Sequence, residues 1–220
     1  MAKVVIFGVQ DFAQLGCFYL RHDSPHEVVA FSVHEEFMPE SRTFEGLPVV
    51  PFERVEETHP ASEFSFFAPM SHRRMNRLRE TVYKEIKEKG YELISYVSSH
   101  ATVFPGAKIG DNCFILEDNT IQPFAEIGSN VVLWSGNHIG HHSVIKDHVL
   151  FTSHVVLSGH CTVEPYSFFG VNATVRDGVT IAEGTLIAMA ASVTRDTEAW
   201  GVYKGSPAKK GEVLSKDLDF

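Results

Sequence analysis

The sequence is poor in cysteine and has no long apolar run. Its 220 residues include three cysteines, Cys17, Cys113 and Cys161, which are widely spaced and form no CxxC pair. A scattered, odd set of this kind indicates small buried thiols in a reducing compartment and argues against a disulfide framework. No stretch reaches the length that crosses a membrane, and the apolar run at residues 4–7 is too short for a signal peptide. We therefore expect a cytoplasmic protein.

Positive charge is also in short supply. The chain carries 19 Lys and Arg against 28 Asp and Glu, which gives a formal net charge of −9 at pH 7. This balance disfavours nonspecific binding to nucleic acid or to an anionic membrane, so neither is expected as a partner. An anionic small-molecule substrate remains compatible with it, because backbone N–H groups and a few lysines can bind such a molecule locally.

The chain is organised around a six-residue repeat that runs from residue 97 to residue 193. No residue larger than Val or Asn stands four places after the first position of each hexad. No insertion breaks the register, so a substrate must bind on an outer face or between subunits. A short fixed period is typical of a parallel β-helix, whose interior is filled by the large residue of each repeat. That first position is large and apolar in seventeen consecutive hexads: Val97, Val103, Ile109, Ile115, Ile121, Ile127, Leu133, Ile139, Ile145, Phe151, Leu157, Val163, Phe169, Val175, Ile181, Ile187 and Val193.

The first 96 residues predict an α/β domain with a small parallel sheet. Residues 3–33 have the pattern of a strand, a helix and a second strand, which is a βαβ unit. A further strand is expected at 64–68, then a helix at 73–89 that Gly90 ends, then a last strand at 93–97. We expect a nucleotide-binding domain at 1–96, a β-helix domain at 97–210 and a C-terminal tail at 211–220.

The loop that starts at Gly8 bears on nucleotide binding. A dinucleotide site has the pattern GxGxxG, and only its first glycine is present here. Asp11 stands where a pyrophosphate would meet the helix N-terminus, which is electrostatically unfavourable. These features argue against NAD and leave two interpretations. Either a small sheet holds a nucleotide by its edges, with Gly8, Gln10 and Phe12 as contacts, or the segment is a plain packing module.

Histidines are concentrated in one part of the repeat. Six of the twelve fall within residues 138–160, and three of those, His138, His141 and His142, lie within five residues. A histidine that titrates near neutral pH suits general-base catalysis, and imidazole also binds zinc or iron. The spacing matches no zinc motif. We therefore favour the general base and expect no metal cofactor.

The hexads, the segment Gly140-His141-His142 and the closing segment at 202–209 resemble hexapeptide-repeat acyltransferases. With the βαβ unit, the resemblance narrows to the nucleotide-sugar N-acetyltransferases of bacterial surface-glycan synthesis, such as lipopolysaccharide O-antigen biosynthesis. This group contains the bacillosamine-pathway acetyltransferase, and the sialic acid O-acetyltransferases share its layout. The resemblance implies an α/β domain followed by a left-handed parallel β-helix. It also implies acetyl-CoA as co-substrate, a UDP- or dTDP-linked amino sugar, and a homotrimer with active sites between subunits.

The resemblance makes His141 the general base, because it holds the third position of its hexad. Bacillosamine-type enzymes have a glutamate after this histidine, whereas this chain has His142. Gly159 follows His141 by eighteen residues, which is one coil if three hexads make a coil, and we expect its backbone N–H to stabilise the oxyanion. The sugar nucleotide is expected to contact Trp134, Asn137 and His138 as well. A purely structural role for Asn137 and simple interface packing for Trp134 are equally compatible with the sequence. The residues expected to bind acetyl-CoA are Gly170, Val171, Met189, Ala190, Lys204, Gly205, Pro207 and Lys209, the lysines lying near its phosphates.

Three other functions remain compatible with the sequence. The first is O-acetylation of a sugar, as in the sialic acid group, where a hydroxyl would need more help from the base than an amine. The second is a metal-dependent β-helix enzyme of the γ-carbonic-anhydrase kind, which would leave the βαβ unit and the closing segment without a purpose. The third is a non-catalytic binding prism, against which the clustered histidines argue.

Overall fold

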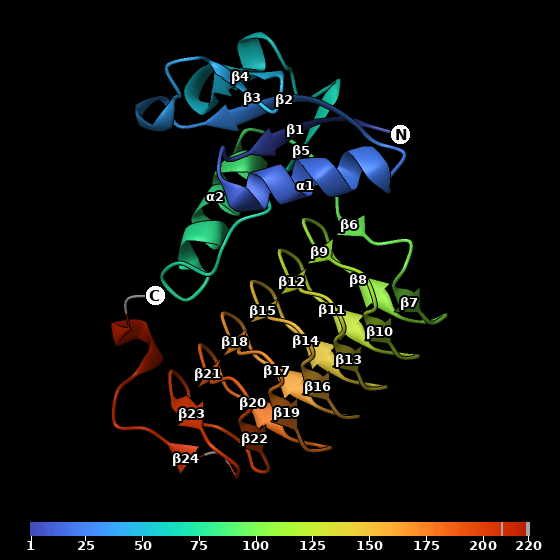
Figure 1. The fold of residues 1–220 in the computed structure, drawn as a ribbon, viewed down its shortest axis with the longest axis vertical. Coiled ribbons are helices and arrows are strands. Elements are labelled where there is room, and N and C mark those ends of the chain that lie inside the picture. The colour runs from blue at the N-terminus through green and yellow to red at the C-terminus, as the bar shows by residue number, and fades with distance from the viewer. Residues whose placement is uncertain (208, 219–220) are drawn as a thin grey trace.

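The computed structural model describes residues 1–207 and 209–218, and Figure 1 shows an α/β part above a long β-helix. The first part holds a five-stranded sheet of order β3-β4-β2-β1-β5, parallel except for the β3–β4 hairpin. Ala208 of the closing segment and residues 219–220 of the predicted tail lie outside the described residues. The elements of this part are β1 (Lys3–Phe7), α1 (Asp11–His22), β2 (Glu27–Val33), η1 (Glu35–Phe37), β3 (Thr43–Phe44), β4 (Leu47–Pro51), η2 (Phe52–Glu57), β5 (Phe64–Phe67) and α2 (Arg77–Glu88).

The predicted start of the second helix is wrong by four residues. α2 begins at Arg77 and not at residue 73, because Arg74, Met75 and Asn76 all have positive φ. The buried Asn76 amide donates to the backbone oxygens of Tyr166 and Ser167 on the β-helix, at 3.1 and 3.3 Å. This long-range anchor holds the chain in a left-handed conformation, which a local sequence pattern does not reveal.

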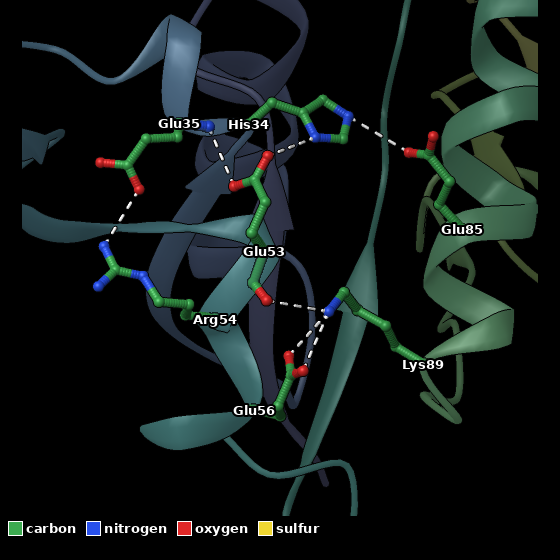
Figure 2. Close-up of polar contacts among 7 residues, drawn as sticks. All are labelled: His34, Glu35, Glu53, Arg54, Glu56, Glu85 and Lys89. Atoms are coloured by element: carbon green, nitrogen blue, oxygen red, sulfur yellow. Dashed lines mark hydrogen bonds and ion pairs between the residues drawn. The ribbon is translucent and has the colours of Figure 1, made fainter.

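Charged side chains join η2 to α2 at one end of the small sheet (Figure 2). His34, directly after β2, places Nδ1 3.2 Å from Glu53 and Nε2 3.2 Å from Glu85 of α2. Lys89 donates to the Glu53 carbonyl and the Glu56 carboxylate. Burial tends to raise the pKa of Glu53, but hydrogen bonds from the backbone and from His34 outweigh it and hold that pKa below its usual value. These contacts fix α2 against the sheet.

The β-helix follows the predicted register through seventeen short strands. Each strand, from β6 to β22, has two residues and ends on a predicted large apolar residue. The interior residues are buried from Ile115 onward, whereas Val103 in the first coil is 38% exposed. The first coil is less covered because no coil lies above it, and the α/β part packs mainly on one side. The prediction of a repeat without insertions is confirmed.

The strands stack into three parallel sheets. Sheet 1 begins with β6 (Tyr96–Val97), β9 (Phe114–Ile115), β12 (Val132–Leu133), β15 (Leu150–Phe151), β18 (Phe168–Phe169) and β21 (Leu186–Ile187), and ends with β23 (Val202–Lys204) and the antiparallel β24 (Lys209–Lys210). Sheet 2 contains β7 (Thr102–Val103), β10 (Thr120–Ile121), β13 (His138–Ile139), β16 (Val156–Leu157), β19 (Thr174–Val175) and β22 (Ser192–Val193). Sheet 3 contains β8 (Lys108–Ile109), β11 (Glu126–Ile127), β14 (Val144–Ile145), β17 (Thr162–Val163) and β20 (Thr180–Ile181). We call the turns between sheets corner 1–2, corner 2–3 and corner 3–1. A last short helix, η3 (Ser215–Asp217), follows β24.

The α/β part covers sheet 1 and corner 3–1 of the prism. Residues of α1, including Cys17 and Leu20, share a core with the outward side chains Phe114, Val132 and Leu150 of sheet 1. From α2, the buried Arg79 donates to the backbone oxygens of His148 and Val149. Sheet 2 and corner 2–3 lie away from these contacts. The boundary expected between residues 96 and 97 stays a prediction, although β6 is the first strand of the prism.

No helix in the described part of the chain combines the length and the hydropathy that a membrane span needs. The expected cytoplasmic location stays a prediction.

Candidate active site

His141 lies on corner 2–3, in the turn between β13 and β14. Its side chain is exposed, and its backbone N–H donates to Gln122 Oε1 at 2.9 Å. Gly140 before it needs to be glycine, because a Cβ there would lie 2.4 Å from the Ser158 carbonyl carbon on the next coil. The close stacking of coils therefore fixes the backbone of His141 while its ring stays accessible.

Gly159 stands next to the His141 ring, as the eighteen-residue spacing predicts. A Cβ at Gly159 would lie 2.9 Å from His141 Nε2 and 3.0 Å from Asp177 Oδ1. Because glycine has no side chain, a gap is left between the imidazole on one side and the carboxylate on the other. Among the described residues, the structure shows no acceptor for the Gly159 N–H.

Asp177 is the residue that our sequence analysis missed. It follows His141 by thirty-six residues and occupies the same corner two coils further on. The eighteen-residue spacing, applied twice instead of once, points to it. An exposed carboxylate facing the His141 gap supplies a negative charge near the ring, although it is not the neighbouring glutamate of the bacillosamine type.

His142 takes the place of that glutamate beside the base. His141 Nδ1 lies 3.1 Å from His142 Nδ1, so one of these nitrogens donates a hydrogen and the other accepts it. If His141 carries its proton on Nδ1, then Nε2 faces Gly159 with a free lone pair. His160 completes the group, with its ring 5.0 Å from each of the other two rings.

Four of the six clustered histidines have a structural reason for their position. The fourth residue has positive φ in every hexad except the first and the last, and His142, His148, His154 and His160 all occupy that position. Histidine is one of the residue types enriched in the left-handed region. The number of histidines therefore overstated the site. His138, on sheet 2, and the third-position residue His141 are the two that this backbone conformation does not explain.

A second group of predicted residues lies along corner 1–2. Trp134 follows β12 and packs edge-on against Phe12 of α1, with ring centroids 5.6 Å apart. Gly8 and Gln10 lie in the loop between β1 and α1, just before Phe12. Gly170 stacks closely under Met189, since a Cβ there would lie 2.4 Å from the Met189 nitrogen. Val171 and Ala190 are exposed beside them on this corner. The structure therefore places four of the six expected sugar-nucleotide residues and four of the eight expected CoA residues along this edge.

Of two further predicted residues, His138 lies on the outside of the prism and Asn137 lies inside it. His138 is half-buried on the outer face of sheet 2, on the same coil as His141. Asn137 is only 1% exposed, and its side chain bonds the backbone carbonyl of Trp134 and the N–H of Val155. Asn137 therefore lies inside the prism, where it satisfies buried backbone groups, and we remove it from the site.

The remaining predicted CoA residues form the hairpin at the end of the prism. Lys204 and Lys209 are paired across β23 and β24, and both are exposed. Gly205 accepts a hydrogen bond from the Ser192 N–H of sheet 2 at 3.0 Å, and Pro207 lies exposed in the turn. The hairpin thus places two lysines near the far end of sheet 2.

His141 and the corner 1–2 group lie on different edges of one prism. His141 follows sheet 2, whereas Trp134, Val171 and Met189 precede it. Exposed apolar side chains flank both edges, including Phe124 and Val156 on one side and Met189 on the other. The predicted site residues of one chain therefore lie along two separate edges of the prism.

The structure excludes the cysteines as nucleophiles. All three are free and buried. Burial raises the pKa of Cys17 and Cys161, and raises the pKa of Cys113 to about 12. A thiol with a raised pKa carries little of the reactive thiolate at neutral pH. The exposed imidazole of His141 is the better candidate for chemistry at this surface.

A hollow on corner 3–1 is lined by cations but lies away from the predicted residues. Arg74, Arg77 and Lys216 surround it, and the Arg77 guanidinium lies 4.6 Å from the Trp200 ring centroid. None of the predicted site residues lines this hollow. We therefore give the geometry around His141 more weight.

The fold and repeats define the class of the protein: an N-terminal α/β domain followed by a left-handed parallel β-helix of hexapeptide repeats. The family model "Bacterial transferase hexapeptide (six repeats)" matches residues 106–141. The predicted fold class is confirmed.

Solved structures of whole chains share this fold. The perosamine N-acetyltransferase of Caulobacter crescentus, with CoA and GDP-perosamine bound to a histidine variant, is 23% identical with a TM-score of 0.85, over 97% of this chain and 98% of that one. The acetyltransferase domain of PglB from Neisseria gonorrhoeae is 18% identical with a TM-score of 0.80, over 96% and 100%. WeeI from Acinetobacter baumannii is 17% identical with a TM-score of 0.80, over 96% and 100%. The predicted resemblance to this group is confirmed at the level of the fold.

Proposed function

We propose that this protein transfers the acetyl group of acetyl-CoA to the amino group of a nucleotide-linked amino deoxy sugar in bacterial surface-glycan synthesis. The observation that carries the proposal is the position of His141, with Nε2 directed at the gap over Gly159. The whole-chain similarity to an N-acetyltransferase with CoA and GDP-perosamine supports it. So does a related acetyltransferase domain in complex with acetyl-CoA.

The proposed reaction needs a base, because only a neutral amine is a nucleophile. His141 Nε2 accepts a proton from the sugar amine as its nitrogen attacks the thioester carbonyl carbon. The tetrahedral intermediate then collapses, the carbon–sulfur bond breaks, and the CoA sulfur leaves with the proton that His141 returns. His142 Nδ1 lies 3.1 Å from His141 Nδ1 and accepts a hydrogen bond from it. This bond keeps the proton of the neutral His141 on Nδ1, leaves the Nε2 lone pair free and orients the ring.

The oxyanion of that intermediate needs a fixed donor. The Gly159 N–H, for which the described residues provide no acceptor, is the group we propose. The Asp177 carboxylate faces the same gap, and a negative charge there would repel an oxyanion. We therefore propose that Asp177 attracts the ammonium form of the substrate as it arrives. The ammonium group then releases one proton to water and becomes the neutral amine that reacts at His141, while the Asp177 carboxylate turns toward solvent, where it is already exposed.

The variant Asp177→Asn separates attraction of the substrate ammonium group from repulsion of the oxyanion. If the carboxylate attracts the ammonium group, we expect KM for the amino sugar to rise about two- to fivefold, the scale of one exposed charge pair, while kcat stays close to the wild-type value. Steady-state kinetics at fixed, saturating acetyl-CoA measure both constants. Asp147→Asn, at a third position of the same kind on corner 3–1, is the matched control and should leave both unchanged. A higher kcat with unaltered KM would show instead that Asp177 only opposes the oxyanion.

A homotrimer is part of the proposal. Its support is the division of the site between corner 2–3, which carries His141, and corner 1–2, which carries Trp134, Val171 and Met189. Neighbouring prisms that place these edges face to face would complete the site and cover the exposed Phe124 and Met189 side chains. The lysines of the end hairpin, Lys204 and Lys209, are then the proposed partners of the CoA phosphates.

The α/β domain is proposed to hold the nucleotide at the carboxyl ends of β1 and β5, where the strand order of the sheet reverses. Gly8 and Gln10 lie in the loop that follows β1, and Phe12 lies in the first turn of α1. We expected a UDP- or dTDP-sugar, and a similar structure contains a GDP-sugar, so all three nucleotides need testing.

The test is incubation with acetyl-CoA and a panel of UDP-, dTDP- and GDP-linked amino sugars, followed by mass spectrometry of the products. We expect one amino sugar to gain an acetyl group and CoA to appear in equal amount. Calorimetric titration with CoA accompanies it. If CoA does not bind and no product forms, the protein is a binding prism and the proposal fails.

A further inference from the structure

Three imidazoles converge at corner 2–3. His141, His142 and His160 are all exposed, and each offers a ring nitrogen within 4.8 Å of those of the other two. We propose that these three side chains bind a divalent transition-metal ion of the zinc, cobalt or nickel kind, and that this ion and acyl transfer exclude one another because both use His141. The exclusion rests on the proposed function, whereas the ion site does not.

The distances suit such an ion after a small movement. Zinc binds imidazole nitrogen at about 2.0–2.1 Å, so two ligands of a tetrahedral site lie about 3.3 Å apart. His141 Nδ1 and His142 Nδ1 are already 3.1 Å apart. The third nitrogen has to approach by roughly 1.5 Å to close the set. Rotation of an exposed side chain supplies a shift of that size.

The backbone that carries these ligands is held in place. His142 and His160 occupy the left-handed turn position of successive coils, and their rings are stacked with an interplanar angle of 13°. The His160 N–H donates to the His141 carbonyl at 3.0 Å, which ties the two turns together. Only side-chain rotation is left to organise on binding, which lowers the entropic cost of forming the site.

The local charge also favours a cation. The Asp177 carboxylate faces the gap beside the His141 ring and places an acidic group near the three ligands. Three neutral imidazoles with one open position for water form a ligand set that zinc accepts, and the same ligands suit nickel and copper.

Ion binding removes the base for a chemical reason. A neutral imidazole has one lone pair and one N–H. If an ion takes the lone pair of His141 Nδ1, the proton must reside on Nε2, the nitrogen that faces Gly159. Nε2 can then accept no proton from an amine. The ion is therefore an inhibitor and not a cofactor, and chelator-treated protein should transfer acetyl groups at the full rate.

The site itself is tested by titrating chelator-stripped protein with Zn²⁺ in a calorimeter and with Co²⁺ by visible absorption. We expect one ion per chain, and at least a tenfold loss of affinity in His160→Asn. Asparagine suits the left-handed turn, so this variant should fold normally. His154→Asn changes the same turn position on corner 1–2 and should bind the ion as the wild type does. No saturable binding, or equal affinity in His160→Asn, would overturn the site.

Acetyl transfer provides the second readout. Zn²⁺ should inhibit the wild type, and His160→Asn should match its metal-free rate but resist inhibition at the same ion concentration. Activation by Zn²⁺ would contradict mutual exclusion. A protein that binds the ion through the histidines but acetylates no amino sugar would refute the proposed function and leave the ion site standing.

Discussion

Replacing His141 with alanine should lower kcat about a hundredfold or more, the usual contribution of a positioned general base. The ring is exposed at the turn and fills no part of the core, so the variant should keep the melting temperature of the wild type. The loss should therefore appear in turnover and not in the amount of folded protein. Steady-state rates of CoA release and thermal melting followed by circular dichroism measure the two quantities.

The matched control for this variant is His160→Asn, which changes a neighbouring ring in the same cluster but removes no base. It should retain wild-type turnover in chelator-treated buffer. Wild-type turnover in His141→Ala would end the assignment of His141 as the base. A loss of the same size in both variants would show that the cluster acts as a unit, which our account does not allow.

Gly159→Ala should abolish most of the activity while the protein stays folded. The new methyl group would lie 2.8 Å from His141 Cε1 and 3.0 Å from Asp177 Oδ1, so both side chains have to move. Those atoms belong to exposed, movable side chains, and the change in the free energy of unfolding should stay within about 0.5 kcal/mol. Displacing a catalytic group by about 1 Å can cost about a hundredfold in rate.

Gly140→Ala is the contrasting control. A Cβ at Gly140 would meet the Ser158 and Gly159 backbone at 2.4–2.6 Å, and backbone inside a stacked coil cannot move aside. We expect this variant to melt at a clearly lower temperature. Melting curves and kcat for both variants show whether each change affects activity, stability or both. If Gly159→Ala were fully active, the gap over Gly159 would not be where the amine reacts.

The sequence predicts the β-helix almost completely, because burial leaves little freedom there. A shift of the hexad by one residue would turn Ile139 or Leu157 outward, and both are fully buried at the predicted positions. The small fifth position, where Ala125 and Ala173 lie, is fixed by the same packing. A local period therefore predicts a fold when the core repeats with it.

Other features depend on contacts between distant residues, which no local pattern shows. The late start of α2 follows from Asn76 bonding to Tyr166 and Ser167 on the β-helix. Asn137 was expected beside the substrate although it holds the small fifth position of its hexad, and the structure shows its amide bonding buried backbone groups inside the prism. These two cases have the same cause. In each, the side-chain amide of an asparagine forms hydrogen bonds with buried backbone groups of the β-helix.

The site was predicted in part. The spacing rule placed Gly159 beside His141, and it would have found Asp177 on the following coil. The histidine count was less informative than it looked, because the turn conformation favours histidine at His148 and His154 without any chemistry. The separation of His141 from Trp134 and Met189 on two edges emerges only when the hexads are assigned to sheets. The roles of these residues stay predictions until the variants are measured.

The central claim, that His141 activates an amine for acetyl transfer, is tested most directly with two nucleotide sugars that differ only at one carbon. One carries an amino group there and the other a hydroxyl group. Acetyl-CoA is supplied with each, and the product is identified by mass spectrometry and its rate of formation is measured. Our account predicts an N-acetylated product that forms rapidly with the amine and much more slowly with the hydroxyl. Acetylation of the hydroxyl sugar alone, or of neither sugar across the nucleotide panel, would contradict it.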